Sequence, residues 1–560
     1  MAESQVAPHR EAEVREEVSE AFFEQIAVDV VNVEVFVQDR EGRPVTHLTR
    51  DDFLVFEDDR PVEVVNFYRV AGGRPDIDSL AAPQTVDTPL PEREIEPLIP
   101  ESQRLHLVVY VDNYHLHALN RNRVFNRLRQ FLQQTVSPGD EVMVATYDRS
   151  LHIRQPFTRD VQQVNRQLLE LEKLTGFAAE REAERSRALA RIYETQSHYE
   201  ALWEAKQFAE HAHFGLQQAL SGFEELLDSL AGLPGRKVLI HVSDGLPMVP
   251  GQDLYQAVQQ RFADLSALGE AFSRDTSRTY MQLIAQANSS RIAIYTIDAS
   301  GLQIHSGFGA EEPAVRSPFV VSTAVDAVRS SNLQDTLVMV ADRTGGQSII
   351  NTNDVGDGLA RFAVDLENYY SLGYRAPIEN RGRYHRIEVR LKDRQRGWKI
   401  RHREGYRDKS VSLEMSEAAE AFLAHGYETN PLEVSFAIEE QRAGKGDTVD
   451  VSISVRVPIE RLVLLPRPGF HEARLRIYFG AVDERGRKAP LRDLPFELRI
   501  PDDALERARR DSLVRVIDAT MRPGPHKIVI GVRDEIGAVR SIVGRGLAVR
   551  PTPDGGSSPR

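Results

Sequence analysis

The 560-residue chain contains no cysteine, and no uninterrupted run of apolar residues in it approaches the length of a membrane span. The lack of cysteine excludes disulfides, thiolate metal sites and cysteine nucleophiles, although it leaves the cellular compartment open. A transmembrane helix needs roughly 18 or more consecutive apolar residues. We therefore predict no transmembrane segment and expect packing alone to stabilise the fold.

The chain has fewer positive than negative charges. It contains 70 Lys and Arg residues and 84 Asp and Glu residues, which gives a formal net charge of −14. A negative chain repels polyphosphate, which disfavours nucleic acids and anionic membranes as partners. Residues 381–409 are the one strongly basic stretch, and their alternation is typical of a strand with a solvated outer face. The sequence therefore predicts no nucleic-acid partner.

Recognisable catalytic motifs are absent as well. The sequence has no G-x-S-x-G nucleophile elbow, no H-E-x-x-H zinc helix and no G-x-x-x-x-G-K-[ST] phosphate loop. We interpret the chain as a non-enzymatic protein-binding or scaffold protein. A hydrolytic enzyme with unmarked catalytic residues is the third hypothesis, after the metal-dependent one described below.

The patterns that are present change along the chain, which is too long for a single hydrophobic core. Short apolar runs at residues 107–111, 238–242 and 292–297 are separated by helical patterns, which predicts parallel neighbours in one doubly wound α/β sheet. The predicted organisation is an acidic N-terminal segment (1–27), a small β unit (28–70), a Pro-rich linker (71–103), an α/β domain (104–375) with a helical insertion (176–213), a β-hairpin extension (376–410), a helical linker (411–430), an antiparallel β-sandwich (431–550) and a disordered tail (551–560).

The hairpin extension is predicted from alternation. Ile387, Val389 and Leu391 face one way between charged residues, and Trp398 and Ile400 repeat this pattern after a turn. Two adjacent alternating segments of this kind are typical of an antiparallel hairpin. We expect the two segments to pair with each other.

Two aspartates follow apolar strands of the α/β domain. Asp112 comes directly after residues 107–111, and Asp244 comes after residues 238–242. Open α/β sheets bind ligands outside the carboxyl ends of their strands, so this pattern predicts a site there. Aspartate is also a common helix cap and turn residue, and that structural reading stays open.

Histidines lie in or near the same loops. His115, His117 and His241 offer nitrogen ligands for a transition metal, but their spacing matches no fixed metal-binding pattern. Solvated loop histidines are the alternative interpretation.

Several segments resemble a known family. These segments lie within roughly residues 28–406 and include "VVNVEVFVQDREGRPVTHLTRDDFLVFEDDRP", "LVVYVDNYHL", "PGDEVMVATYD", "KVLIHVSDGLP", "IAIYTIDASGL" and "DLENYYSLGYRA". They resemble the VWFA-related acidobacterial domain family, which has the von Willebrand factor A-like fold. The resemblance implies a doubly wound α/β domain with a metal-ion-dependent adhesion site made from Asp-x-Ser-x-Ser, a threonine and a second aspartate.

Mapped onto this sequence, the resemblance assigns Asp112, Asp244 and Thr175 to the metal site. Tyr114 and Leu116 stand where the two serines are expected, so two hydroxyl ligands are missing. Mg²⁺ prefers a near-octahedral shell of oxygens, and the prediction is therefore a degenerate site and no cofactor. The alternative is a divalent-metal-dependent adhesin that holds Mg²⁺ or Ca²⁺ weakly and binds an acidic group of its partner through the ion.

The expected partner is another protein of unknown identity, and the oligomeric state is not predicted. We expect the partner-binding residues to be Asn113, Tyr114, His115 and Gly245, where the loops of the sheet meet the helical insertion. The resemblance implies an exported protein, periplasmic or extracellular. No signal peptide is visible at the start of the chain, where acidic residues replace the expected positive charge.

Overall fold

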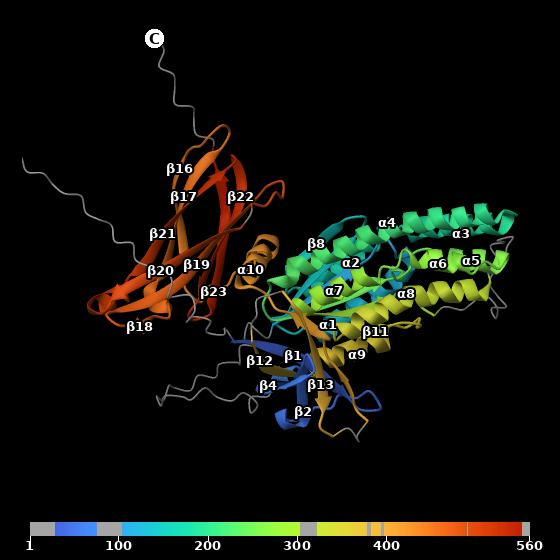
Figure 1. Ribbon diagram of the computed structural model, residues 1–560, viewed down its shortest axis with the longest axis horizontal. Coiled ribbons are helices and arrows are strands. Elements are labelled where there is room, and N and C mark those ends of the chain that lie inside the picture. The colour runs from blue at the N-terminus through green and yellow to red at the C-terminus, as the bar shows by residue number, and fades with distance from the viewer. Residues whose placement is uncertain are drawn as a thin grey trace, which may run out of the picture.

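The computed structural model describes residues 28–75, 104–302, 322–377, 382–393, 397–489 and 491–550. Figure 1 shows three bodies: a β unit built from the blue N-terminal strands and later strands, an α/β domain, and a β-sandwich in orange and red. The segments predicted at residues 1–27 and 551–560, and most of the predicted linker, lie outside the described residues.

The β unit consists of two sheets that share one core. The first has the strand order β14-β1-β12-β4-β5 and the second has the order β15-β13-β2-β3. Alternating valines of β1 point into this core together with Tyr370 and Leu372. The bounds are β1 Val28–Gln38, β2 Phe53–Glu57, β3 Arg60–Val62, β4 Val64–Ala71, β5 Arg74–Pro75, β12 Tyr369–Pro377, β13 Tyr384–Leu391, β14 Lys399–Arg401 and β15 Gly405–Arg407.

The predicted hairpin between β13 and β14 is wrong. β13 pairs with β2 and β14 pairs with β1, so the two segments lie in opposite sheets. Alternation correctly placed Ile387, Val389 and Leu391 on the core side, where they are buried. It did not identify their partners, because both sheets turn apolar side chains toward the same core. β12, which the sequence assigned to the α/β domain, also belongs here, since it pairs with β1 and β4.

The central sheet of the α/β domain has the strand order β11-β10-β9-β6-β7-β8. β6 is parallel to β7 and β9, and β9 is parallel to β10, so the predicted parallel neighbours are confirmed. Only β8, at one edge, runs antiparallel. The bounds are β6 Leu105–Val111, β7 Glu141–Tyr147, β8 Leu151–Thr158, β9 Arg236–Ser243, β10 Ile292–Asp298 and β11 Ser348–Ile349.

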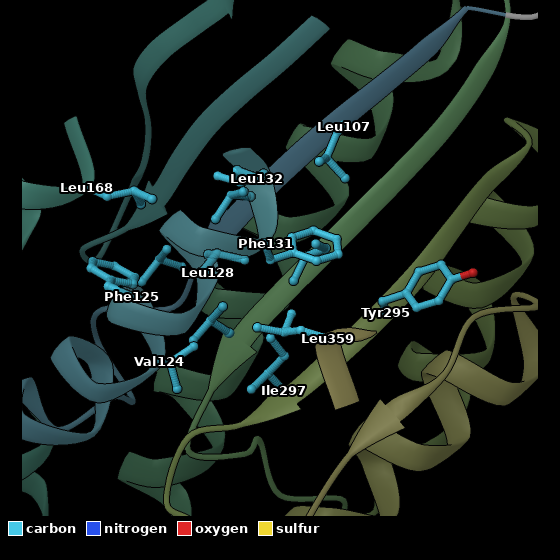
Figure 2. Packing of buried hydrophobic residues seen from close by; sticks show 14 of the residues in the cluster. Leu107, Val124, Phe125, Leu128, Phe131, Leu132, Leu168, Tyr295, Ile297 and Leu359 are labelled. Atoms are coloured by element: carbon cyan, nitrogen blue, oxygen red, sulfur yellow. The ribbon is translucent and has the colours of Figure 1, made fainter. Parts of the chain in front are cut away.

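Helices cover both faces of this sheet. Successive side chains of a strand point to opposite faces, and the central strands β6 and β9 are buried at every position, so both faces need to be covered. One face packs Leu107 and Val109 against α1 (Ala118–Thr135), α2 (Val161–Leu171) and α9 (Gly356–Glu367), as Figure 2 shows for part of this cluster. The other face packs Val108 and Tyr110 against α4 (His198–Ala231) and α7 (Ser277–Ser289), and α8 (Thr323–Arg343) contacts β10 beside them.

The helical insertion is larger than its sequence pattern suggested. α3 (Ala178–Glu194) is followed by α4, which continues without a break through residue 213, where the insertion was expected to end. The first half of α4 and α3 form a separate core with α5 (Gln252–Phe262), α6 (Ser266–Phe272) and Val325 of α8. These helices extend beyond the sheet at the right of Figure 1.

The C-terminal part is an antiparallel sandwich joined to the α/β domain by α10 (Val411–His425), which ends at Gly426 in the left-handed conformation. α10 contacts α4 on one side and the sandwich on the other. The sandwich strands are β16 Ser435–Ala443, β17 Val449–Pro458, β18 Leu465–Arg467, β19 Phe470–Asp483, β20 Arg492–Pro501, β21 Ser512–Met521, β22 Gly524–Asp534 and β23 Val539–Val549, with the short helix α11 (Leu505–Ala508) before β21. No helix in the described part of the chain has the length and apolar character needed to cross a membrane.

Candidate functional site

The candidate site lies at the carboxyl ends of β6 and β9. These two strands are neighbours in the middle of the sheet, at the point where the strand order changes direction. Open α/β sheets have a crevice at such a point, because the connections after the two strands lead to opposite faces. The sequence placed Asp112 and Asp244 directly after these strands, and the structure brings both loops to this edge.

Asp112 is only 2% exposed and forms a buried pair with His115. His115 Nδ1 lies 2.8 Å from Asp112 Oδ2, and the Ser243 hydroxyl donates to the same oxygen over 3.1 Å. Burial opposes the charge on Asp112, but the nearby His115 imidazole outweighs it and holds the pKa of the carboxyl below its ordinary value. Burial lowers the pKa of the His115 imidazole, and Arg181 adds to this effect. An ionised carboxylate only accepts hydrogen bonds, so Nδ1 carries the proton and Nε2 is an acceptor.

Asp244 belongs to a different set of contacts. Its Oδ2 accepts from the backbone N–H of His117 over 2.9 Å and lies 2.9 Å from His117 Nδ1. The Asn120 amide donates to both carboxylate oxygens over 3.1 Å. The carboxylate thus satisfies N–H groups at the start of α1, where negative charge is favourable. The hydrogen bond to Asp244 raises the pKa of the His117 imidazole.

Asn113 holds the neighbouring loops together. Its amide nitrogen donates to Asp148 after β7 over 2.6 Å and to the carbonyl of Thr175 over 3.2 Å. Its amide oxygen accepts from the buried Arg121 guanidinium. Arg121 also donates to the carbonyls of Glu172 and Leu174, so one arginine fixes the loop that carries Thr175. The sequence contains one sign of this role, because Arg121 is a charged residue on the apolar face of the helix that became α1.

The residues at the expected metal-site positions differ from the oxygen donors of an adhesion-type site. Leu116, at the second serine position, is fully buried in the core beneath α1. Thr175 is exposed and takes part through its carbonyl rather than its hydroxyl. Among the described residues there is no group of three or more histidine or acidic side chains placed to share a metal ion. These residues therefore do not fit the oxygen shell that Mg²⁺ prefers.

We accordingly expect Mg²⁺ to bind no more tightly than millimolar, which corresponds to about 4 kcal/mol of binding free energy. Isothermal titration calorimetry of the full chain with MgCl₂ measures this directly. The matched control is the Asp112→Ala variant, whose heats should equal those of the original chain. A micromolar signal that disappears in Asp112→Ala would instead establish the metal-dependent adhesin.

A pocket opens over these loops, and the insertion forms its other side. Tyr114, His115 and Gly245 line it from the sheet edge, and side chains of α3, α4 and α8 face them. Its volume is about 120 Å³, which is comparable with a cavity that holds one benzene ring. Gly245 has φ +101°, and a Cβ there would lie 2.8 Å from the Cβ of Leu333 on α8, so only glycine fits. Of the four predicted partner-binding residues, only Asn113 does not line the pocket.

Tyr114 occupies the centre of a cluster of rings and guanidinium groups. Its ring centre lies 5.8 Å from Cζ of Arg149 and 5.2 Å from Cζ of Arg181, on α3. Phe177 and Tyr147 pack at 5.9 and 6.2 Å between ring centres. The tyrosine at the first serine position therefore connects the sheet edge to the insertion through cation–π contacts.

Buried ion pairs attach the insertion above the pocket. Arg185 of α3 donates from Nε to Asp253 of α5 over 2.6 Å, and it also lies near Glu182 and near Asp326 of α8. Arg181 and Arg185 were not predicted from the sequence. α3 contains many Arg and Glu residues at similar spacing, and no local signal separates the buried arginines from the solvated ones.

Comparisons with known proteins find similar solved structures at low sequence identity. No protein-family model and no curated protein matches the chain. Similar solved structures include an aerotolerance-related membrane protein from Bacteroides fragilis, with 10% identity over 47% of this chain and 98% of that one and a TM-score of 0.23. BatB from Bacteroides thetaiotaomicron has 9% identity over 47% and 97%, with a TM-score of 0.21. The manganese-loaded TRAP protein of Plasmodium vivax has 9% identity over 54% and 94%, with a TM-score of 0.22. Sequence identities and TM-scores this low assign no ligand or partner to this chain.

Proposed function

We propose that this chain is a non-enzymatic protein-binding protein of the von Willebrand factor A-like fold, in the VWFA-related acidobacterial family, and that it acts outside the cytoplasm. The observation that carries the proposal is the pocket at the carboxyl edge, between the loops after β6 and β9 and the inserted helix α3. Its position is the one at which open α/β sheets bind ligands. Its volume suits one side chain of a partner better than a complete small-molecule substrate.

The chemistry of the pocket favours binding over catalysis. The Asp112–His115 pair resembles the base half of a catalytic triad, but a triad also needs a nucleophile within hydrogen-bond reach of the imidazole. Among the described residues that line the pocket there is no serine, threonine, cysteine or lysine. Ser243, which is buried, donates to Asp112 and is therefore on the wrong side of the pair. This arrangement supports a site that holds a ligand without forming a covalent bond to it.

The metal-dependent adhesin is the alternative, and the calorimetric experiment above separates it from this proposal. In the proposed protein the pocket is closed on one side by α3, which is held by Arg185, and no ion is needed to form it.

Filling the pocket should abolish partner capture. Ala212 of α4 lines the pocket, so Ala212→Phe places a ring inside it, whereas Ala179 of α3 is exposed nearby and Ala179→Phe makes the same chemical change in solvent. Tagged full-length protein is incubated with an envelope extract of the source organism, and bound proteins are quantified by mass spectrometry. We expect at least one protein to be captured by the original chain and Ala179→Phe and to fall at least tenfold with Ala212→Phe. Equal capture by all three chains would contradict the proposal.

Deleting residues 178–211 would be a less informative test of the insertion. The sequence suggests that this helical segment can be removed without harm, but the structure shows that it is part of a shared core. The deletion would break α4 and expose the core that Leu254 and Tyr255 of α5 form with the insertion. Loss of capture in such a chain would not distinguish a missing surface from a damaged domain.

A further inference from the structure

The charged side chains around the pocket form pairs, with one exception. Four carboxylates line the pocket, and each has a cation or imidazole within ion-pair distance. Asp244 and Asp253 have the partners described above, and the other two, both on α3, pair with Arg329 and His211. The exception is Arg181, which lines the same pocket from the first turn of α3.

The Arg181 guanidinium makes no hydrogen bond or ion pair with any residue that the structure describes. Its close contact is the face of the Tyr114 ring, 5.2 Å from Cζ. Arg181 is half-buried, so its guanidinium loses part of its water, and the face of the Tyr114 ring replaces that water only in part. Burial accordingly lowers the pKa of the Arg181 guanidinium. The position is thus prepared for an anion that arrives with the ligand.

A second polar group, in another side chain that lines the pocket, also lacks a partner. His115 is buried at 5% exposure, lines the pocket, and its Nε2 has no hydrogen-bond partner among the described residues. Its Nδ1 is occupied by Asp112. A ligand that brings an anionic group to Arg181 and an N–H or O–H group to His115 Nε2 would satisfy both.

We propose that the pocket binds the carboxylate of an acidic side chain of the partner protein through Arg181, without a metal ion. This inference rests on the proposed function, because it names the group that the partner inserts. A guanidinium offers two parallel N–H donors in the geometry of a carboxylate, and the pairing is strongest where water is excluded. The pocket volume of about 120 Å³ admits one side chain of this size.

The test uses the full-length protein with the probe N-acetyl-glutamate methylamide and its neutral isostere N-acetyl-glutamine methylamide. Saturation-transfer NMR titration in EDTA gives both dissociation constants. We expect the glutamate probe to bind at least tenfold more tightly than the glutamine probe. Arg181→Gln should remove this preference, and Arg181→Lys should keep part of it. The matched control is Arg187→Gln, which makes the same change at an exposed position of the same helix and should behave as the original chain.

Equal binding of the two probes, an unchanged preference in Arg181→Gln, or binding that requires added Mg²⁺ would each overturn the inference. A further arm uses glutarate, and tighter binding of this free acid than of the glutamate probe would overturn the assignment to a protein side chain. Loss of capture in Ala212→Phe together with equal binding of the two probes would leave the proposed function in place and reject only the acidic ligand. Retained capture in Ala212→Phe would reject the proposed function itself.

Discussion

Lowering the pH from 7 to 4.5 is expected to reduce the free energy of unfolding by about 4 kcal/mol through two buried histidines. Burial lowers the pKa of both the His106 and the His241 imidazole to about 4, from an ordinary value of 6.5. Lys237 adds to the effect at His106, and burial outweighs Glu141, which lies 3.6 Å from the ring. The neutral His241 ring packs against Tyr110 and Phe223.

The sign follows from the proton balance between the two states. Between pH 6.5 and pH 4 an unfolded chain protonates these histidines, whereas the folded chain keeps them neutral. The unfolded state therefore binds more protons in this window, and stability falls as the pH falls through it. Each histidine accounts for about 2 kcal/mol between pH 7 and pH 4.5. Below this window, loss of the Asp112 carboxylate charge adds in the same direction, because the pKa of that carboxyl is lowered in the folded state.

Urea denaturation followed by circular dichroism at pH 7, 5.5 and 4.5 measures the effect. His241→Phe replaces the ring by one that cannot be protonated, and it should reduce the pH dependence by about 2 kcal/mol. The control is His152→Phe, since His152 lies on the solvent side of β8 and is exposed. A pH dependence that is the same in His241→Phe and in the original chain would show that this ring is not buried in its neutral form.

The central sheet and the place of the site could be predicted from the sequence, because both depend on local pattern and general topology. Residues 107–111 form an apolar run that fits a strand covered on both faces, and that strand is fully buried. Once β6 and β9 are parallel neighbours, Asp112 and Asp244 must lie at one edge. The loops that carry Tyr114, His115 and Gly245 follow these two strands, so their place beside the pocket could be predicted as well.

Pairing between distant segments could not be predicted in this way. β1 pairs with β12 more than 300 residues later, and β13 pairs with β2 over a similar separation. Alternation indicates which side of a strand is apolar but not which strands pair with it. The sequence therefore predicts that the segment with Ile387, Val389 and Leu391 pairs with the segment that contains Trp398 and Ile400, and this pairing is wrong. The length of α4 was missed for a related reason, since the insertion and the following helix have the same period.

The arginines that shape the pocket were the hardest residues to predict. Arg181, Arg185, Arg187 and Arg191 all lie on α3, and two of them are exposed. Their roles depend on which face of α3 meets α5 and α8, and that face is determined by tertiary packing rather than by helical propensity. Arg185 is the member whose removal should be most costly.

Replacing Arg185 by methionine is expected to lower the free energy for opening of the insertion by about 3–5 kcal/mol. Arg185 is 7% exposed, and its Nε lies 2.6 Å from Oδ2 of the buried Asp253. Methionine retains much of the apolar volume but leaves that carboxylate buried without its guanidinium. Hydrogen–deuterium exchange of residues 178–194, followed by mass spectrometry, measures the opening of α3 in the full chain.

Two further variants separate this buried pair from a general effect of removing charge. Arg191→Met makes the same change on the same helix, where the side chain is 61% exposed and pairs with Glu204 at 3.1 Å, and it should cost less than about 1 kcal/mol. Arg185→Met combined with Asp253→Leu removes both charges, so no unpaired carboxylate remains buried and most of the lost protection should return. If the double variant exchanges as fast as Arg185→Met alone, the loss of protection comes from lost packing rather than from the unpaired buried charge of Asp253. If Arg191→Met and Arg185→Met exchange alike, the buried pair does not hold α3 over the pocket, and another contact must position Arg181.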